Sequence, residues 1–213
     1  PAAPTAPAAP AQPGETEKTE TQPNSAAWVN PFTDVNTSDW FYSEIEYAYT
    51  HGLFAGTSAD AFSPNTPMTR GMIVTVLARL YGADVKEYTV SGFDDVAAGK
   101  YYTPYVEWAK QNGVVNGVGD NKFAPDAEIT RQDLAVIITN YARFANKQFP
   151  VTLQYQIFAD EADIAEYAKS AVQTLYCGNI IGGKPNNIFD PKGSATRAEV
   201  AAILHRFVVN TSV

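Results

Sequence analysis

SATRAEVAAIL, residues 194–204, decides how this 213-residue sequence is organised. Thr196 followed by Glu199 ahead of an apolar run is the capping-box start of a helix. Arg197 falls in the first turn of that helix, where a cation faces the positive end of the helix dipole at a cost of roughly a few tenths of a kcal/mol or more. The same pair opens two further helical patterns, at Thr69–Arg70 and Thr130–Arg131. Three arginines placed in this way need a common reason.

The Thr–Arg pairs are the last part of a unit that occurs three times. Each unit begins with Phe-x-Asp, has a glycine twenty residues after that phenylalanine and a second glycine four residues later, and then has Phe-x-Pro five residues before the threonine. The triplets begin at Phe32, Phe93 and Phe158, the glycine pairs are Gly52/Gly56, Gly113/Gly117 and Gly178/Gly182, and the Phe-x-Pro triplets begin at Phe62, Phe123 and Phe189. One extra residue in the third unit is placed between Gly182 and Phe189. The predicted repeats are 28–86, 87–150 and 151–213.

Each repeat is predicted to form a helix, a loop and a second helix. In the second helix, apolar residues recur at i, i+3, i+4 and i+7, as in Ile73, Val76, Leu77 and Leu80. Three equivalent stripes can bury one another around a pseudo-threefold axis. We therefore expect a mainly α fold of three tandem helix–loop–helix repeats, in which the second helices form a central three-helix bundle with three lobes around it.

Composition excludes several classes of function. A formal net charge of −8 disfavours nucleic acid and a membrane surface, and no apolar run approaches the roughly 20 residues of a membrane span. One cysteine and two histidines give no intramolecular disulfide and too few ligands for zinc, so no metal or cofactor is expected. No serine, cysteine or acidic pair stands in a catalytic spacing, so no enzyme is expected. Residues 1–27, rich in Pro, Ala and Thr, are predicted to be an extended linker, with a cargo domain upstream.

These motifs resemble the surface-layer homology (SLH) domain. The similarity spans about residues 30–207 and includes Phe32/Asp34/Val35, Phe93/Asp95/Val96 and the three Thr–Arg pairs. The resemblance implies a three-pronged spindle that is secreted to the bacterial cell surface and anchors a surface-layer protein or surface enzyme. It also implies a ligand, a secondary cell-wall polysaccharide often carrying pyruvate on its terminal N-acetylmannosamine, held in grooves between the repeats.

The resemblance further implies which residues border the grooves. The arginines that meet the acid of the glycan are Arg70, Arg131 and Arg197. The other positions are Asp34, Asp95 and Asp160 of the Phe-x-Asp triplets, the turn glycines Gly52, Gly113 and Gly178, and the aromatic residues Trp40 and Tyr101.

The arginines have a physical explanation in this setting. A helix N-terminus offers unpaired backbone N–H groups to an anion, and a guanidinium adds a bidentate clamp for a carboxylate. The alternative is that each arginine pairs with Asp34, Asp95 or Asp160 and braces its lobe. Trp40 and Tyr101, and also Tyr102, can stack on sugar or pack, whereas Trp108 is expected to pack.

No repeat carries every motif residue. The first has Met72 where the third has the capping acid Glu199, and the second has the shorter Asp133. The third has Glu166 where the others have Trp40 and Tyr101. The three grooves are therefore expected to bind unequally, with the Arg131 groove first on motif completeness. A protein–protein interaction module within a surface array is the alternative function, and a glycan-processing enzyme is a more distant one.

Overall fold

The computed structural model describes residues 28–211, and the linker predicted for residues 1–27 lies outside them. The described residues form six α-helices and two 3-10 turns, with isolated β-bridges but no β-strand, which confirms the mainly α prediction. The α-helices are α1 (Tyr42–Thr50), α2 (Arg70–Tyr81), α3 (Thr103–Gln111), α4 (Arg131–Phe144), α5 (Glu166–Cys177) and α6 (Arg197–Asn210), and the 3-10 turns are η1 (Glu161–Asp163) and η2 (Pro185–Asn187).

The second helix of each repeat begins at the arginine of its Thr–Arg pair. The side chain of Thr69 accepts a hydrogen bond from the backbone N–H of Met72, and Thr130 and Thr196 cap α4 and α6 in the same way. Only α6, of the described helices, also has the reciprocal bond that completes a capping box, from the backbone N–H of Thr196 to Glu199. Local capping chemistry therefore sets these three helix starts.

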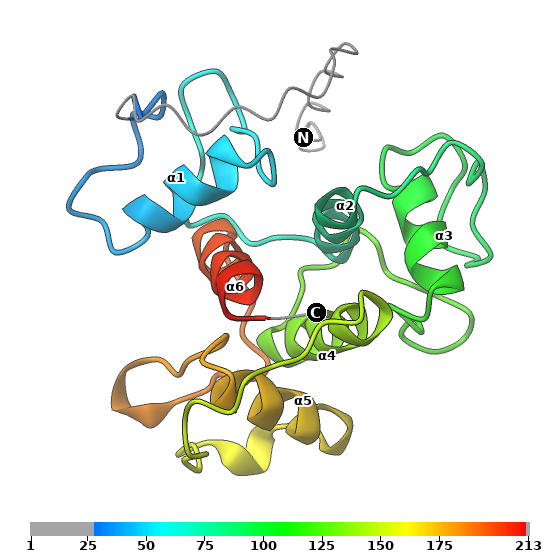
Figure 1. The fold of residues 1–213 in the computed structure, drawn as a ribbon. Coiled ribbons are helices and arrows are strands. Elements are labelled where there is room, and N and C mark those ends of the chain that lie inside the picture. The colour runs from blue at the N-terminus through cyan, green and yellow to red at the C-terminus, as the bar shows by residue number, and fades with distance from the viewer. Residues whose placement is uncertain (1–27, 212–213) are drawn as a thin grey trace, which may run out of the picture.

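Helices α2, α4 and α6 gather at the centre of the molecule, with α1, α3 and α5 outside them (Figure 1). The predicted apolar stripes are buried in this bundle, except that Leu80 is only partly buried. The buried members are Ile73, Val76, Leu77, Leu134, Ile137, Ile138, Tyr141, Val200, Ile203, Leu204 and Phe207. Full burial of one such side chain contributes about 1.5–3 kcal/mol. The shared interior of the bundle is therefore a main source of stability, as the periodicity predicted.

The outer helices do not pack mainly on the second helix of their own repeat. Helix α3 packs against α2, α5 against α4, and α1 against α6 (Figure 1). Each lobe thus combines the first helix of one repeat with the second helix of the preceding repeat, and the first repeat uses the last. The repeats are interlocked, and contacts between α1 and α6 close the ring.

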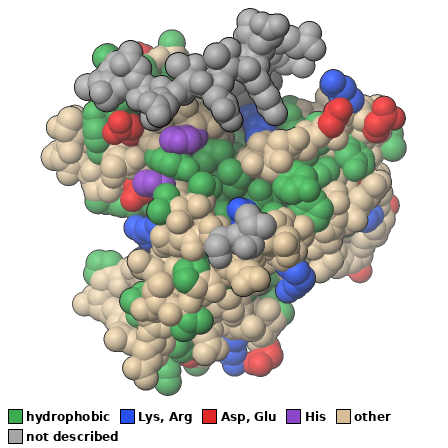
Figure 2. Space-filling model, viewed as in Figure 1, with side chains coloured by type: hydrophobic (Ala, Val, Ile, Leu, Met, Phe, Trp, Pro, Cys, Tyr) green, Lys and Arg blue, Asp and Glu red, His purple; other side chains and the backbone are tan. Residues whose placement is uncertain are grey.

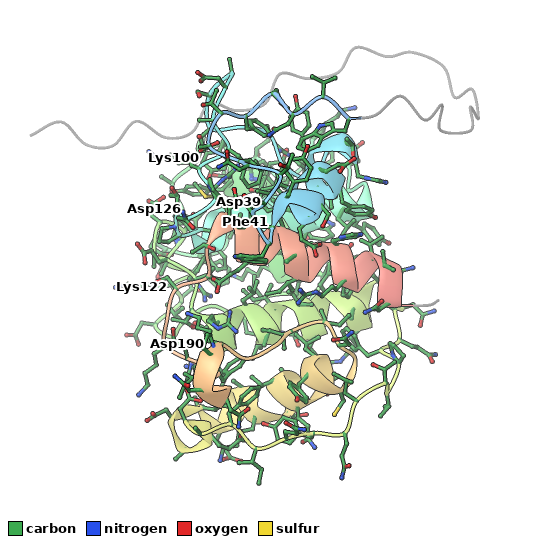
Figure 3. The ribbon with its side chains drawn as sticks, turned by 90° about the vertical axis from the view of Figure 1, so that its left-hand side faces the viewer. Asp39, Phe41, Lys100, Lys122, Asp126 and Asp190 are labelled. Carbon is green, nitrogen blue, oxygen red and sulfur yellow. The ribbon has the colours of Figure 1, made fainter. Side chains whose placement is uncertain are left out.

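Backbone hydrogen bonds close a second ring where the bundle helices begin. The N–H of Met68 donates to the carbonyl of Ala195 (3.0 Å), Ala195 to Ile129 (3.0 Å), and Ile129 back to Met68 (2.9 Å). Residues that precede α1 and α3 and residues of the Phe-x-Pro loops gather at this end of the molecule, as the labelled Phe41, Lys100, Lys122, Asp126 and Asp190 show in Figure 3. All three repeats therefore meet at one end.

An aromatic stack strengthens the contact between α1 and α6. The ring of Tyr47 lies between the imidazoles of His51 and His205, with centroid distances of 3.9 Å on both sides. Nδ1 of His205 is 2.6 Å from Oε2 of Glu44. Both histidines appear on the face drawn in Figure 2, beside a band of hydrophobic side chains. The histidines thus belong to the closure of the ring.

The extra residue of the third repeat lies elsewhere than predicted. The first two repeats end their first helix with a left-handed glycine, at Gly52 and Gly113 (φ 67° in both), but the left-handed residue in the third is Asn179 (φ 56°). Gly178, placed in line with them by spacing, has φ −78°. The extra residue is therefore upstream of Asn179, and the placement between Gly182 and Phe189 is wrong.

The second glycine of each repeat can be aligned by its close contact with the phenylalanine that begins the repeat. A Cβ on Gly56 or Gly117 would lie 2.7 or 2.8 Å from the ring of Phe32 or Phe93, and the same contact with Phe158 (2.9 Å) is made by Gly183, not Gly182. The phenylalanine that starts each repeat packs on this bare backbone. Only glycine fits there.

Candidate functional site

The arginines of the three Thr–Arg pairs are buried and reach into the next repeat. Their exposed fractions are 6% for Arg70, 4% for Arg131 and 8% for Arg197. Each Nε donates a 2.8 Å hydrogen bond to the carbonyl oxygen of a Phe-x-Pro phenylalanine, namely Phe123, Phe189 and Phe62 respectively. The guanidinium also lies over that ring, 4.6–5.2 Å from its centroid. Each arginine thus joins two repeats and is held rigidly.

The helix N-termini are not free to bind an anion. At α2, the backbone N–H of Arg70 donates to Ala127 (2.9 Å), that of Gly71 donates to Pro125 (2.9 Å), and that of Met72 is capped by Thr69. The loops of the following repeats pair the first two N–H groups of α4 and α6 in the same way, through Gly193, Pro191, Thr66 and Pro64. The prediction of unpaired N–H groups is therefore wrong, and only the guanidinium groups remain to meet an acid.

The aspartates of the Phe-x-Asp triplets hold the Phe-x-Pro loops. Asp95 accepts hydrogen bonds from the backbone N–H groups of Phe123 (2.8 Å) and Ala124 (2.7 Å). Asp34 and Asp160 each accept two equivalent bonds. Burial by itself would raise the pKa of Asp95, but these hydrogen bonds hold that pKa below its ordinary value. Because the same loops present their carbonyl oxygens to the arginines, the aspartates position the arginines indirectly.

The arginines pair with different acids from those expected. Nη1 of Arg70 is 3.4 Å from Asp133, and Nη1 of Arg131 is 3.2 Å from Glu199. Each acid is the third residue of the next bundle helix, so the last residue of one T-R-x-x motif serves the arginine of the preceding repeat. No described arginine is paired with Asp34, Asp95 or Asp160 in an ion pair. The alternative in which Asp34, Asp95 and Asp160 brace the arginines is therefore wrong in its partners, although Arg70 and Arg131 do pair with other acids.

Arg197 has no carboxylate partner within residues 28–211. Its Nη2 donates to the carbonyl of Ala55 (2.7 Å), and its guanidinium lies over the rings of Phe54 and Phe62. The position equivalent to Asp133 and Glu199 is Met72 in the first repeat. Burial lowers the pKa of Arg197 to about 10, and the charge of Asp34, which forms no ion pair with Arg197, offsets this effect only in part.

A cavity of about 460 Å³ opens beside Arg131 and is built by all three repeats. The second repeat contributes Arg131, the third contributes the 181–185 loop and one side of α6, and the first contributes Trp40. Trp40 is 61% exposed. Arg206 and Lys184 also line the cavity, and Glu199 is its one acid. A buried cation and an exposed aromatic ring thus line the same cavity.

A second cavity, of about 600 Å³, opens beside Arg70 with the same plan. Its loop is 114–118, its helix is α4, and its aromatic residue is Tyr167, which is 62% exposed. In this cavity Tyr167 is therefore the equivalent of Trp40 in the Arg131 cavity. The motif spacing had aligned Glu166, one position earlier, with Trp40. This places the extra residue between Asp160 and Tyr167, in the segment that contains η1. Tyr167 donates a 2.6 Å hydrogen bond to Asp133, so its hydroxyl is tied to the acid that neutralises Arg70.

Other aromatic residues have packing roles. Trp108 is 4% exposed and lies edge-on to Phe144 at 5.4 Å, which confirms its predicted role. Tyr102 is also 4% exposed. Tyr101 is half-buried and lines neither of the two cavities.

The glycines and aspartates predicted for the site do not line the two cavities either. Gly52, Gly113, Gly178, Asp34, Asp95 and Asp160 are absent from both linings. The residues that sequence reasoning missed are Tyr167, Gly117, Gly182, Gly183, Lys184, Arg206, Asp133 and Glu199. Asp133 and Glu199 were noticed as caps, but no local pattern shows that they serve the arginine of the preceding repeat.

Three interlocked helical repeats with arginine-and-aromatic cavities between them define a class of repeat protein with inter-repeat sites. A family model described as the S-layer homology domain matches residues 31–71, 92–135 and 157–201, more than half of the sequence. The chain therefore belongs to the S-layer homology (SLH) family.

Several named proteins are similar to this chain. An amylopullulanase of Thermoanaerobacterium thermosulfurigenes is 31% identical over 82% of this chain and 9% of its own length. The S-layer protein sap of Bacillus anthracis is 26% identical (81% and 20%), and a cellulosome-anchoring protein of Acetivibrio thermocellus is 25% identical (83% and 40%). The chain thus spans less than half the length of these relatives. The family and these relatives indicate a protein of the cell surface, associated with the cell wall.

None of the helices between residues 28 and 211 is both long and apolar enough to cross a membrane.

Proposed function

We propose that this chain is a non-covalent wall-anchoring module that binds a secondary cell-wall polysaccharide, pyruvylated on its terminal N-acetylmannosamine, between its repeats. The module holds an attached protein segment at the wall and catalyses no reaction itself. Relatives named as an S-layer protein and as a cellulosome-anchoring protein support this role.

One observation carries the proposal: the Arg131 cavity is lined by both a buried guanidinium and the exposed ring of Trp40. A sugar has apolar C–H faces that an exposed indole can cover, and hydroxyl and acid groups that polar side chains can bind. Pockets for small ligands combine such apolar walls with a few fixed polar groups. The rigid hydrogen bonds of Arg131 to Phe189 and Gly182 preorganise the polar part.

The acidic residues favour binding over hydrolysis. Glycoside hydrolysis ordinarily uses two carboxyl groups, about 5–9.5 Å apart, on either side of the scissile bond. Each cavity has one acid among its lining residues, Glu199 or Asp133, and each acid is paired with an arginine. Neither cavity therefore offers the pair of free acids that the reaction requires.

Calorimetric titration with purified wall polysaccharide tests the proposal. The polymer is used in its native form and after mild acid treatment that removes pyruvate, against the wild-type chain and the variants Arg70→Ala, Arg131→Ala and Arg197→Ala. We expect binding that depends on pyruvate and falls in at least one variant. Circular dichroism of each variant confirms that it is folded.

Capture on sacculi separates this function from the alternative of a protein–protein interaction module. Wall sacculi freed of all protein should retain the purified, monomeric chain. If sacculi fail to retain it and the native polymer gives no heat, the arginines are internal braces and the wall-glycan proposal is wrong.

A further inference from the structure

The three arginine sites differ in charge, although each arginine donates from Nε to the equivalent phenylalanine carbonyl. The guanidinium groups of Arg70 and Arg131 each meet a carboxylate, from Asp133 and Glu199. Both acids occupy the third position of a bundle helix, and the third member of this cycle, opposite Arg197, is Met72. Two sites are thus neutralised internally, and the third keeps its positive charge.

A retained positive charge at a buried position is unfavourable by itself. Removing a guanidinium from water costs free energy that an adjacent counter-charge normally offsets. Arg197 is 8% exposed and has only carbonyl oxygens and aromatic rings as partners in the described chain. Asp34 acts on Arg197 from a distance, but among the described residues no carboxylate contacts its guanidinium.

Nη1 of Arg197 is the atom left available. In Arg70 and Arg131 the Nη1 atom is the one that binds the carboxylate, whereas Nη1 of Arg197 has no hydrogen-bond partner among the described residues. The one buried side-chain nitrogen or oxygen without a partner in that part of the chain is Nε1 of Trp28. Nη1 of Arg197 is therefore unpaired but not sealed from solvent.

A second position differs among the three repeats. The Arg131 cavity is lined by Arg206, nine positions after Arg197, and the Arg70 cavity by Asn140, nine positions after Arg131. The residue equivalent to Arg206 and Asn140 in the first repeat is Arg79, whose guanidinium lies 5.7 Å from the ring centroid of Tyr105. The first repeat thus has no acid at the capping position and a cation nine positions after Arg70.

We infer that the Arg197 site is the one that binds the carboxylate of an acidic ligand. At the Arg70 and Arg131 sites, the carboxylates of Asp133 and Glu199 already occupy the position that this ligand carboxylate would take. The inference rests on the proposed function, because the acid is identified with the pyruvate ketal of the wall glycan. It assigns different ligand classes to the sites, with the acidic terminal sugar at Arg197 and neutral sugar units at Arg70 and Arg131. It also reverses the ranking by motif completeness, since the missing acid of the first repeat is what makes the site selective.

The decisive variant is Met72→Glu, which supplies the missing internal acid. The probe is the methyl glycoside of N-acetylmannosamine carrying a 4,6-pyruvate ketal, compared with the same glycoside without the ketal. We expect Met72→Glu to lower the affinity for the ketal ligand at least about tenfold, since a charge-assisted contact changes a dissociation constant by about that factor or more. Met72→Gln, of the same shape without the charge, should stay within about threefold of wild type.

The reverse variants test the other two sites. Asp133→Asn and Glu199→Gln each release an internal acid, so calorimetry should show one additional site for the ketal ligand per variant. Wild type should bind one equivalent. A wild-type stoichiometry of three, or unchanged affinity in Met72→Glu, would overturn the inference.

A separate readout keeps this result distinct from failure of the proposed function. Sodium pyruvate alone is titrated while the Nε–Hε signals of Arg70, Arg131 and Arg197 are followed by NMR. A chemical-shift change confined to the Arg197 signal, and absent in Met72→Glu, would support the anion site even if the wall polymer does not bind. If the polymer binds but the chemical shift of the Arg197 signal does not change, the anchor function stands and the Arg197 anion site is wrong.

Discussion

Nε of Arg197 donates to the carbonyl oxygen of Phe62 over 2.8 Å, although the two residues are 135 positions apart in the sequence. The equivalent bonds from Arg70 and Arg131 reach only 53 and 58 positions forward. Each of those bonds joins a repeat to the next, whereas the bond from Arg197 joins the last repeat to the first. The protein is therefore a closed ring of three repeats rather than an open stack.

Closure predicts that two repeats cannot fold by themselves. A chain truncated after residue 150 lacks α6, on which α1 packs, and lacks Ala195, which completes the ring of backbone hydrogen bonds. We expect the fragment to show no cooperative thermal unfolding and to exchange its amide hydrogens rapidly. Circular dichroism and hydrogen exchange measure both. A sharp transition at the wild-type temperature would contradict the closed-ring interpretation.

Asp95→Ala should destabilise the fold through the loop that Asp95 holds. The substitution leaves the backbone N–H groups of Phe123 and Ala124 without their acceptor, at a cost of about 2–3 kcal/mol in the free energy of unfolding. Urea denaturation measures the change. The neighbouring Asp94, exposed and bonded to Asn121, is the control, and Asp94→Ala should cost less than about 1 kcal/mol.

Asp95 should also contribute to acid sensitivity. The folded state holds the pKa of Asp95 below its ordinary value of 3.8, so its stabilisation is present above pH 3.8 and is lost as the pH falls through the folded-state pKa. The stability difference between wild type and Asp95→Ala should therefore narrow below pH 4. A difference that stays constant from pH 6 to pH 2 would show that the charge of Asp95 is irrelevant.

Trp40 and Trp108 should separate binding from stability. Trp40→Ala removes a ring that is 61% exposed, so the free energy of unfolding should change by less than about 0.5 kcal/mol, while affinity for wall polysaccharide falls about tenfold or more. Trp108→Ala empties a buried position and should cost about 3–5 kcal/mol of stability. Chemical denaturation and calorimetric titration of both variants give the comparison. Wild-type affinity in Trp40→Ala would show that the indole does not contribute to binding.

Tyr102 should make the fold sensitive to alkali. Burial, and next the charge of Asp126, raise the pKa of Tyr102 from 10.0 to about 12. Because the folded state holds this proton more tightly than the unfolded chain, the stabilisation is complete below pH 10 and is lost as the pH rises to about 12. The stability advantage of wild type over Tyr102→Phe should therefore shrink between pH 9 and pH 12. An advantage that grows over this range would contradict the assignment.

Binding to the wall polymer should depend little on salt. The chain has a formal net charge of −8, so long-range attraction cannot draw it to an acidic polymer. Short contacts at Arg197 and the two cavities must supply the affinity, and these are screened less than distant charges. We expect the dissociation constant to change less than about threefold between 50 and 300 mM NaCl. A steep loss of affinity with salt would instead indicate polyelectrolyte binding.

The sequence by itself determined the features that depend on short distances along the chain. Thr196 and Glu199 specify a helix start because capping bonds span three residues. The recurrence of apolar residues such as Val200 and Ile203 specifies a buried stripe because the helical period is local. Three copies of this pattern sufficed to predict the central bundle and to single out the three arginines, whose burial only the structure shows.

Tertiary structure alone decided which copy of each element meets which. Nothing near Arg131 in the sequence indicates that its acid is Glu199, and nothing near α1 indicates that its partner is α6. Equivalent repeats carry nearly the same local signals, so these signals cannot distinguish a partner in the same repeat from one in the next. Shape and closure of the ring make that choice, and it leaves Arg197 opposite Met72.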